Sequence, residues 1–89
     1  MILLYSSTFN SAIKKFKDKK ALMELKNVLI ALNSVSTISG FKNSKKLKGH
    51  KAAYRIRIGD YRLGFFDMGN NTLEIDVFVH RKDAYKNWP

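Results

Sequence analysis

The fold class that the sequence predicts is α+β, in the order β-α-α-β-β-β, with a two-helix hairpin packed on one face of a four-stranded antiparallel sheet. Three observations predict it. Apolar and cationic side chains alternate with period two from Tyr54 to Gly64 around a central Gly-Asp pair, which is typical of a two-residue hairpin. A second alternating run fills residues 73–80. Leucines at helical spacing precede both runs, and helices followed by a strand meander suit an α+β sandwich.

The N-terminal part of the chain predicts one strand and two helices. Residues 1–6 form a short strand, and Ser7 or Thr8 can cap the helix that follows. The apolar stripe of this helix is Phe9, Ile13 and Phe16. A second helix begins after Asp18, and its apolar face is Leu22, Leu25, Val28, Leu29 and Leu32. A short polar joint makes the two helices an antiparallel pair whose apolar faces cover the core.

The C-terminal half predicts three strands and a short tail. Residues 34–51 lack periodicity and are interpreted as a long loop. Three strands are expected after this loop, at residues 54–58, 61–66 and 73–80. Residues 67–71 form the turn between the last two strands. The tail forms one helical turn with Trp88 folded back. If strict alternation holds, the face without helices carries Arg55, Arg57, Arg62, Phe66, Phe78 and His80.

Composition limits the class of protein. The 89 residues predict a single domain, 1–89, and the absence of cysteine excludes disulfides and a thiol nucleophile. No apolar run approaches the ~18 residues of a membrane span. The first residues lack the features of a signal peptide, so we expect a cytoplasmic protein that does not enter a membrane. We expect neither a metal ion nor another cofactor.

The positive charge is large and unevenly distributed. The net charge is +10, and between Lys42 and Arg62 eight lysines and arginines stand against one acid, Asp60. Such a field attracts polyanions, and arginine binds phosphate with two parallel hydrogen bonds. A solvated surface is one alternative, and membrane-surface binding is another, although the basic stretch lacks a clean amphipathic helix. We therefore favour RNA or DNA as the partner.

Three motifs in this order resemble the toxins of bacterial type II toxin–antitoxin modules, the RelE/ParE superfamily. They are Lys46-Leu47-Lys48-Gly49, the alternating run from Tyr54 to Arg62, and the closing His80-Arg81-Lys82-Asp83-Ala84-Tyr85. The resemblance covers nearly the whole chain, and the fold of the family agrees with the one derived above. It implies a toxin, usually an endoribonuclease that cuts mRNA and in many members does so on the ribosome.

The chemistry that the resemblance implies needs no metal. The 2′-hydroxyl of RNA attacks the adjacent phosphate when a base takes its proton and fixed cations absorb the growing negative charge. Arg62 matches a position that stabilises the transition state, and Arg55 and Arg57 match positions that place the RNA. The alternative for all three is solvated charge, or pairing with Glu74 and Asp76.

The closing motif supplies the groups that would move protons. His80 is the candidate base, because neutral imidazole accepts a proton readily. The resemblance implies that Arg81 contacts phosphate and that Tyr85 orients the nucleophile or donates a proton. His80 and Arg81 could exchange these roles, since the register of the family varies here. The alternatives are an exposed histidine at the end of a strand and a tyrosine packed on the sheet edge.

The remaining basic residues are assigned to RNA contact without catalysis. His50 is interpreted as an RNA contact or a bystander. The residues expected to bind phosphate without sequence preference are Lys42, Lys45, Lys46, Lys48 and Lys51.

Two rival functions and one partner complete the sequence-based hypotheses. The ParE branch shares the scaffold but poisons DNA gyrase instead of cutting RNA. A non-catalytic RNA-binding module is the third hypothesis, in which Phe66 and Phe78 stack on bases, or pack against each other or a partner. The expected partners are mRNA, the ribosome, and a cognate antitoxin that is acidic and partly disordered, as the charge of +10 favours.

Overall fold

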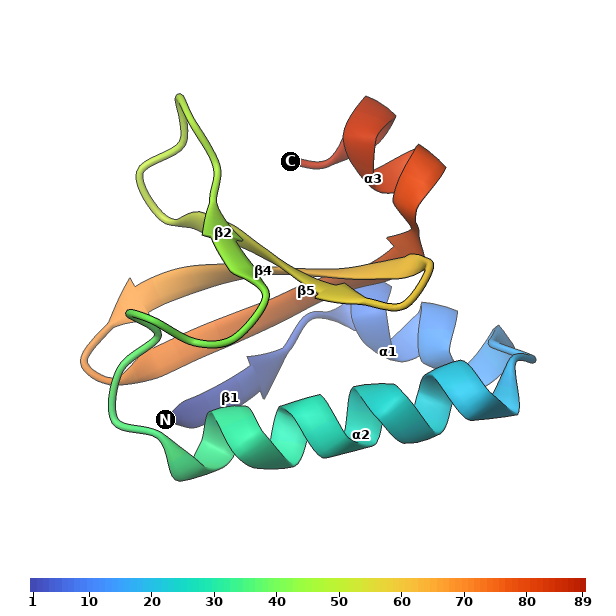
Figure 1. Ribbon diagram of the computed structural model, residues 1–89, viewed down its shortest axis with the longest axis horizontal. Coiled ribbons are helices and arrows are strands. Elements are labelled where there is room, and N and C mark those ends of the chain that lie inside the picture. Colours follow the sequence, from blue (N-terminus) through green and yellow to red (C-terminus); the bar gives the residue numbers. More distant parts are fainter.

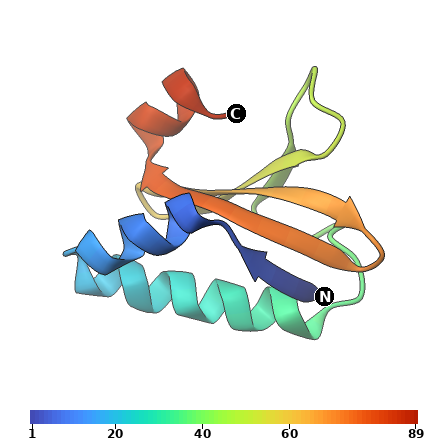
Figure 2. The same ribbon diagram turned by 180° about the vertical axis from the view of Figure 1, so that it is seen from behind.

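The computed structural model describes the backbone of residues 1–89 and every side chain except those of residues 85–87. Its elements are β1 (Ile2–Tyr5), α1 (Ser7–Lys15), α2 (Lys19–Ser34), β2 (Ser44–Lys46), β3 (Ala53–Ile58), β4 (Tyr61–Gly69), β5 (Thr72–His80) and α3 (Arg81–Asn87). The strands form one sheet in the order β1-β5-β4-β3-β2. Helices α1 and α2 lie on one side of this sheet and α3 lies on the other, as Figure 1 and Figure 2 show from opposite directions.

The α+β class is confirmed, but the four-stranded antiparallel sheet is wrong in two respects. Strand β1 runs parallel to β5, because α1 and α2 form the crossover that a parallel pair requires. A fifth strand, β2, lies within the segment expected to be a loop. It pairs with β3 through Lys45 opposite Arg55, and Leu47 N donates to Ala53 O at 2.9 Å. Three polar residues at a sheet edge give no apolar period, so the sequence pattern missed this strand.

Side-chain caps set where the two long helices begin. The Oγ of Ser6 accepts from Phe9 N at 3.0 Å and begins α1, one residue before the expected cap. The Oδ1 of Asp18 accepts from Ala21 N at 3.0 Å and begins α2. The amino group of Met1 donates to the carbonyl oxygen of Leu32 at 3.2 Å, which satisfies one of the last carbonyls of α2.

The core lies between the helix pair and the sheet. Its fully buried large side chains are Phe65, Leu32, Ile56, Leu63, Leu73 and Ile75. The predicted hairpin is confirmed: Ile58 pairs with Tyr61 across a two-residue turn, and Gly59 adopts the positive φ (58°) that such a turn requires. The turn expected at 67–71 is shorter, because β4 continues to Gly69 and only two asparagines remain between the strands.

Strict alternation fails along β5 because of a β-bulge. The register with β4 shifts between Gly64 and Phe65, which leaves Asp76 without a partner across the ladder. Odd-numbered side chains point into the core before the bulge, and even-numbered ones do so after it. Phe78 is only 2% exposed and belongs to the core. The expectation that Phe78 and His80 lie on the face without helices is therefore wrong.

Candidate functional site

Four cations gather on the sheet face that α1 and α2 leave uncovered. We call this surface the guanidinium face, and it consists of Lys45, Arg55, Arg57 and Arg62. Lys45 pairs with Arg55 across β2 and β3, and Arg57 pairs with Arg62 across β3 and β4. The three arginines share one face, as alternation predicted. Like charges directly opposite each other destabilise a sheet, so an anion bound beside either pair relieves this repulsion.

The two arginines of this pair differ in exposure. Arg62 is 9% exposed, and its Nη1 donates to the carbonyl oxygens of Gly59 at 3.0 Å and Tyr61 at 2.8 Å. Arg57 is exposed, and its Nη2 donates to Asn43 Oδ1 at a long 3.4 Å. Arg57 is therefore the guanidinium that an incoming anion reaches first. Arg62 stiffens the β3–β4 turn and adds positive charge at a buried position.

Arg55 binds the C-terminal segment and holds it across the guanidinium face. Its Nη2 donates to the carbonyl oxygens of Ala84 at 3.1 Å and Trp88 at 2.8 Å. The indole Nε1 of Trp88 donates to Asp76 Oδ2 at 2.9 Å. The indole ring lies directly on Gly64, where an added Cβ would come within 2.8 Å of its Cε3. The predicted return of Trp88 is confirmed, and the guanidinium face is partly covered by it.

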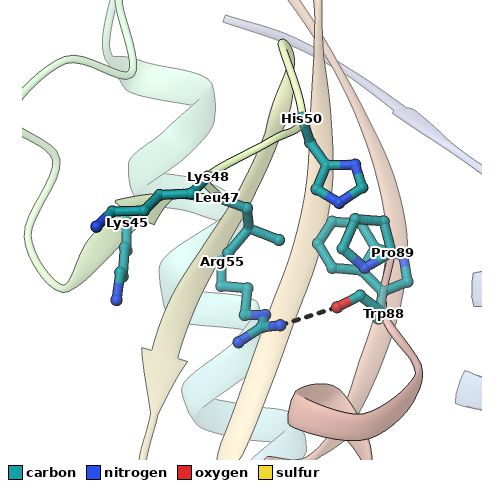
Figure 3. Close-up of a pocket in the computed structure, with 7 residues that line it drawn as sticks. All are labelled: Lys45, Leu47, Lys48, His50, Arg55, Trp88 and Pro89. Carbon is teal, nitrogen blue, oxygen red and sulfur yellow. Dashed lines mark hydrogen bonds between the residues drawn. The ribbon is translucent and has the colours of Figure 1, made fainter.

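Two hollows share Lys45 and Arg55 as lining residues. The first, which we call the arginine hollow, has a volume of about 260 Å³ and is lined by Asn43, Lys45, Arg55, Arg57 and Arg62. The second, the Trp88 pocket, has a volume of about 350 Å³ (Figure 3), and its lining residues are Lys45, Leu47, Lys48, His50, Arg55, Trp88 and Pro89. The segment between β2 and β3 rises on the same side of the sheet as α3 (Figure 1), and the Trp88 pocket lies between this segment and the residues that follow α3.

The predicted base lies on the opposite side of the sheet from the arginines. The rings of His80 and Tyr61 meet edge to face with centroids 5.7 Å apart, and Tyr61 also packs on Phe16 after α1. The Nδ1 of His80 accepts from Lys82 N at 3.3 Å, which makes it the cap of α3. Partial burial, and after it the charge of Asp18, raise the pKa of the Tyr61 phenol.

The other residues of the closing motif belong to α3. The side chain of Arg81 is exposed, and its amide donates to Asp60 O at 2.8 Å, which joins the start of α3 to the β3–β4 turn. The side chain of Tyr85 lies outside the described residues. The structure therefore brings Arg55, Arg57 and Arg62 together, while His80 is separated from them by the sheet.

The five lysines of the central basic stretch lie on or beside the segment between β2 and β3. Lys45 and Lys48 line the Trp88 pocket. Lys46, Lys48 and Lys51 line a further hollow of about 420 Å³ on the same segment. Lys42 is exposed just before β2. Lys45 and Lys48 therefore place positive charge beside the Trp88 pocket.

Sequence reasoning missed three residues that shape the site. Gly64 has no side chain, so the indole of Trp88 packs directly on its backbone. A glycine inside a strand is a recognised signal for such a close approach of another group. Asp76 lies at the β-bulge and accepts a hydrogen bond from the indole of Trp88, a role that the residue pattern did not predict. Asn43 has a positive φ of 63° and offers its side chain to Arg57.

The chemistry that these hollows offer is the binding of negative charge by fixed cations. Within the part of the chain that the structure describes, no three His, Cys, Asp or Glu side chains gather as metal ligands. The same described residues contain no helix of the length and apolar character that crossing a bilayer requires. Arginine and lysine side chains can bind phosphate and stabilise charge that develops on it.

Comparisons with known proteins lead to one group of small toxins. A protein of Methanocaldococcus jannaschii named toxin RelE3 is 28% identical over 90 residues, which span all of both chains. The RelB-RelE antitoxin-toxin complex from Methanococcus jannaschii contains a chain that superposes with a TM-score of 0.80 at 27% identity, over 97% of this chain and 99% of that one. The YoeB dimer from Staphylococcus aureus shares the fold, with a TM-score of 0.72 at 20% identity over 91% of this chain and 97% of its own. No protein-family model matches the chain. The resemblance to RelE toxins found in the sequence is confirmed.

Proposed function

Taking the chain as a member of the RelE family of toxins, we propose that it is the toxin of a type II toxin–antitoxin module and that it cleaves mRNA. The observation that carries the proposal is the guanidinium face, on which three arginines share one side of the sheet and line the arginine hollow. We place this activity in the cytoplasm, on mRNA that is being translated.

RNA binding is supported by the arrangement of charge around the hollows. The arginine hollow presents guanidinium groups, and β2 together with the segment that follows it presents Lys45, Lys46, Lys48 and Lys51. A single strand whose phosphates follow these cations releases counterions, so its affinity falls steeply with added salt. This basic segment is also the surface that would meet ribosomal RNA.

The proposed reaction is attack of a 2′-hydroxyl oxygen on the adjacent phosphorus, with the hydroxyl proton passing to solvent water. The bond from phosphorus to the 5′-oxygen breaks, and the products are a 2′,3′-cyclic phosphate and a free 5′-hydroxyl. Negative charge grows on the phosphate oxygens during this step. We assign Arg57 to bind these oxygens because it is exposed, and Arg62 to stabilise the transition state from its less exposed position beside it.

Proton transfer is assigned to α3 rather than to the sheet. His80 caps α3 and packs on Tyr61, so we propose that it positions this helix and does not touch the RNA. Arg81 and Tyr85, which follow it on α3, remain the candidates for phosphate contact and for proton donation. Arg55 ties α3 to the guanidinium face through the carbonyl of Ala84.

The decisive experiment is incubation of the purified protein with ribosomes and mRNA, followed by mapping of RNA 3′ ends. We expect discrete cleavage by the wild type and a loss of roughly a hundredfold in rate for Arg57→Gln, because one charged contact to the developing phosphate charge is removed. Lys26→Gln on α2 is the matched control, since it removes one exposed cation from the far side of the sheet. Equal rates for the two variants would contradict the assignment.

Two rival outcomes are distinguished by the same protein sample. Inhibition of gyrase supercoiling with intact mRNA would move the chain to the ParE-like function. Tight, salt-dependent RNA binding with no cleavage would leave a binding module. We favour the nuclease because a relative is named toxin RelE3 and because the arginines share one face.

The proposed antitoxin is an acidic, partly disordered chain. Two structural relatives are complexes of RelE with RelB, and the one from Methanococcus jannaschii is an antitoxin-toxin complex. The net charge of +10 favours an acidic partner. We expect the antitoxin to place carboxylates near the guanidinium face or to block access to it, and co-expression with the product of a neighbouring small acidic gene should abolish cleavage.

A further inference from the structure

The Trp88 pocket has one apolar, aromatic side and one cationic side. Leu47, His50, Trp88 and Pro89 supply the rings and the aliphatic surface, while Lys45, Lys48 and Arg55 supply charge. In Figure 3 the imidazole of His50 faces the rings of Trp88 and Pro89, and the ammonium groups of the two lysines extend away from them. A pocket with rings on one side and cations on the other matches a planar ring that carries a phosphate.

The indole of Trp88 is held firmly enough to serve as a fixed wall. Its Nε1 donates to Asp76, its carbonyl accepts from Arg55, and its ring centroid lies 5.2 Å from that of Phe66. The ring also rests on the backbone of Gly64. A preorganised aromatic surface loses little conformational entropy when a ligand stacks on it.

We propose that the Trp88 pocket is a subsite for one unpaired nucleotide of RNA, with the base against Trp88, Pro89 and His50 and its phosphate at Lys45 and Lys48. The volume of about 350 Å³ is in the range of small-ligand pockets. Stacking on aromatic side chains is the common way in which proteins hold bases of single strands. This inference rests on the proposed function and names a second contact for the same substrate.

The pocket continues the path of the strand beyond the reacting phosphate. Arg55 and Lys45 line both the Trp88 pocket and the arginine hollow, so a strand can occupy the two hollows with neighbouring nucleotides. A base inside the Trp88 pocket must be turned out of any double helix, because the pocket lies between the β2–β3 segment and the residues that follow α3. The subsite therefore selects single-stranded RNA.

The test uses Trp88 itself, which is the single tryptophan of the chain. A short single-stranded RNA with 2′-O-methyl groups cannot be cleaved, because its nucleophile is blocked, and it is titrated into the protein while tryptophan fluorescence is recorded. We expect quenching that saturates, and we expect a duplex of the same sequence to quench far less. Uridine monophosphate should quench at high concentration, whereas inorganic phosphate should not.

Two variants assign the signal to this pocket. His50→Ala and Lys48→Gln should each weaken binding by about fivefold to tenfold, as loss of one stacking or one phosphate contact does. Lys26→Gln should bind like the wild type. Binding is also measured by the anisotropy of a labelled RNA, which does not depend on the indole.

The subsite and the proposed function fail in different ways. RNA that binds with unchanged fluorescence, and equally well to His50→Ala and Lys48→Gln, overturns the subsite even if ribosome-bound mRNA is cut. Saturating quenching that both variants weaken supports the subsite even if no mRNA is cut, and in that case it is the nuclease assignment that falls.

Discussion

The two faces of the sheet are built from the same strands and carry opposite chemistry. The face under α1 and α2 carries the fully buried apolar side chains of the core, such as Leu63 and Phe65. The opposite side of the sheet carries the four cations of the guanidinium face, the returning Trp88 and Phe66, against which Trp88 packs. The first face supplies the apolar burial that folding requires, whereas the second is held by a few hydrogen bonds to carbonyls. A small domain can therefore keep its fold and its binding surface on separate sets of alternating residues.

The largest expected effect tests this division with two adjacent phenylalanines of β4. Phe65 is 0% exposed in the core, while Phe66 lies on the other face against Trp88. We expect Phe65→Ala to reduce the free energy of unfolding by about 3–5 kcal/mol, because it opens a cavity. Phe66→Ala should cost about 1 kcal/mol, the scale of one aromatic contact. Urea denaturation measures both, and equal losses would show that the two faces do not differ in this way.

A smaller effect is expected at Gly64, where the guanidinium face meets Trp88. A Cβ there would lie 2.7 Å from Val77 Cγ2 and 2.8 Å from Trp88 Cε3. We expect Gly64→Ala to lower stability by about 1–3 kcal/mol through overpacking and to shift the fluorescence of the displaced indole. In a Trp88→Ala background the same substitution should cost less. If the cost is the same in both backgrounds, the indole does not rest on Gly64.

The pattern of residues predicted the hairpin but not the second half of β5. Around the Gly-Asp turn only one face of β3 is apolar, so a single register satisfies the core. After Asp76 the residues of both parities are apolar, since Val77 and Val79 lie on one side and Phe78 lies on the other. Either register could bury side chains, and an inserted residue leaves no signal of its own. For this reason the sequence did not predict correctly on which face of the sheet His80 lies.

The candidate site was predictable only where it depends on local sequence. Three arginines on one face follow from alternation along β3 and from the turn that joins it to β4. The contact of Trp88 with Gly64 joins residues 24 positions apart, and its hydrogen bond to Asp76 joins residues 12 positions apart. Such long-range contacts form only when the sheet is assembled. Strand β2 likewise exists only because β3 offers an edge to three polar residues.

Substitution of Arg57 tests whether the binding surface can be changed without changing the stability of the fold. Its side chain is exposed and makes one long hydrogen bond, to Asn43. We expect Arg57→Gln to change the free energy of unfolding by less than ~0.5 kcal/mol, as surface substitutions do. RNA affinity should nevertheless fall about tenfold and depend less steeply on salt. A loss of stability that parallels the loss of binding would mean that the two faces are not independent.

The smallest expected effect lies on the covered side, at Tyr61, and is confined to alkaline pH. Partial burial and the nearby charge of Asp18, whose Oδ2 accepts from the phenol at 3.4 Å, raise the pKa of Tyr61 above its ordinary value of 10.0. A group that holds its proton more tightly in the folded state stabilises the fold below its unfolded pKa. That stabilisation is lost as the pH rises through the folded pKa. The free energy of unfolding should therefore fall above about pH 10, and it should fall less in Tyr61→Phe.

Substitution of Asp18 isolates the electrostatic part of this effect. Asn is as good a helix cap as Asp, so Asp18→Asn keeps α2 intact while it removes the charge. Its phenol should ionise at lower pH than in the wild type, because one cause of the raised pKa is gone, yet still above the ordinary value, because partial burial remains. Absorbance of the phenolate at alkaline pH follows the titration, with Tyr61→Phe as the reference that lacks this component. An unchanged titration in Asp18→Asn would assign the raised pKa to burial and to the charge of Asp60, and the contact between the α1–α2 joint and the β3–β4 turn would then contribute packing alone.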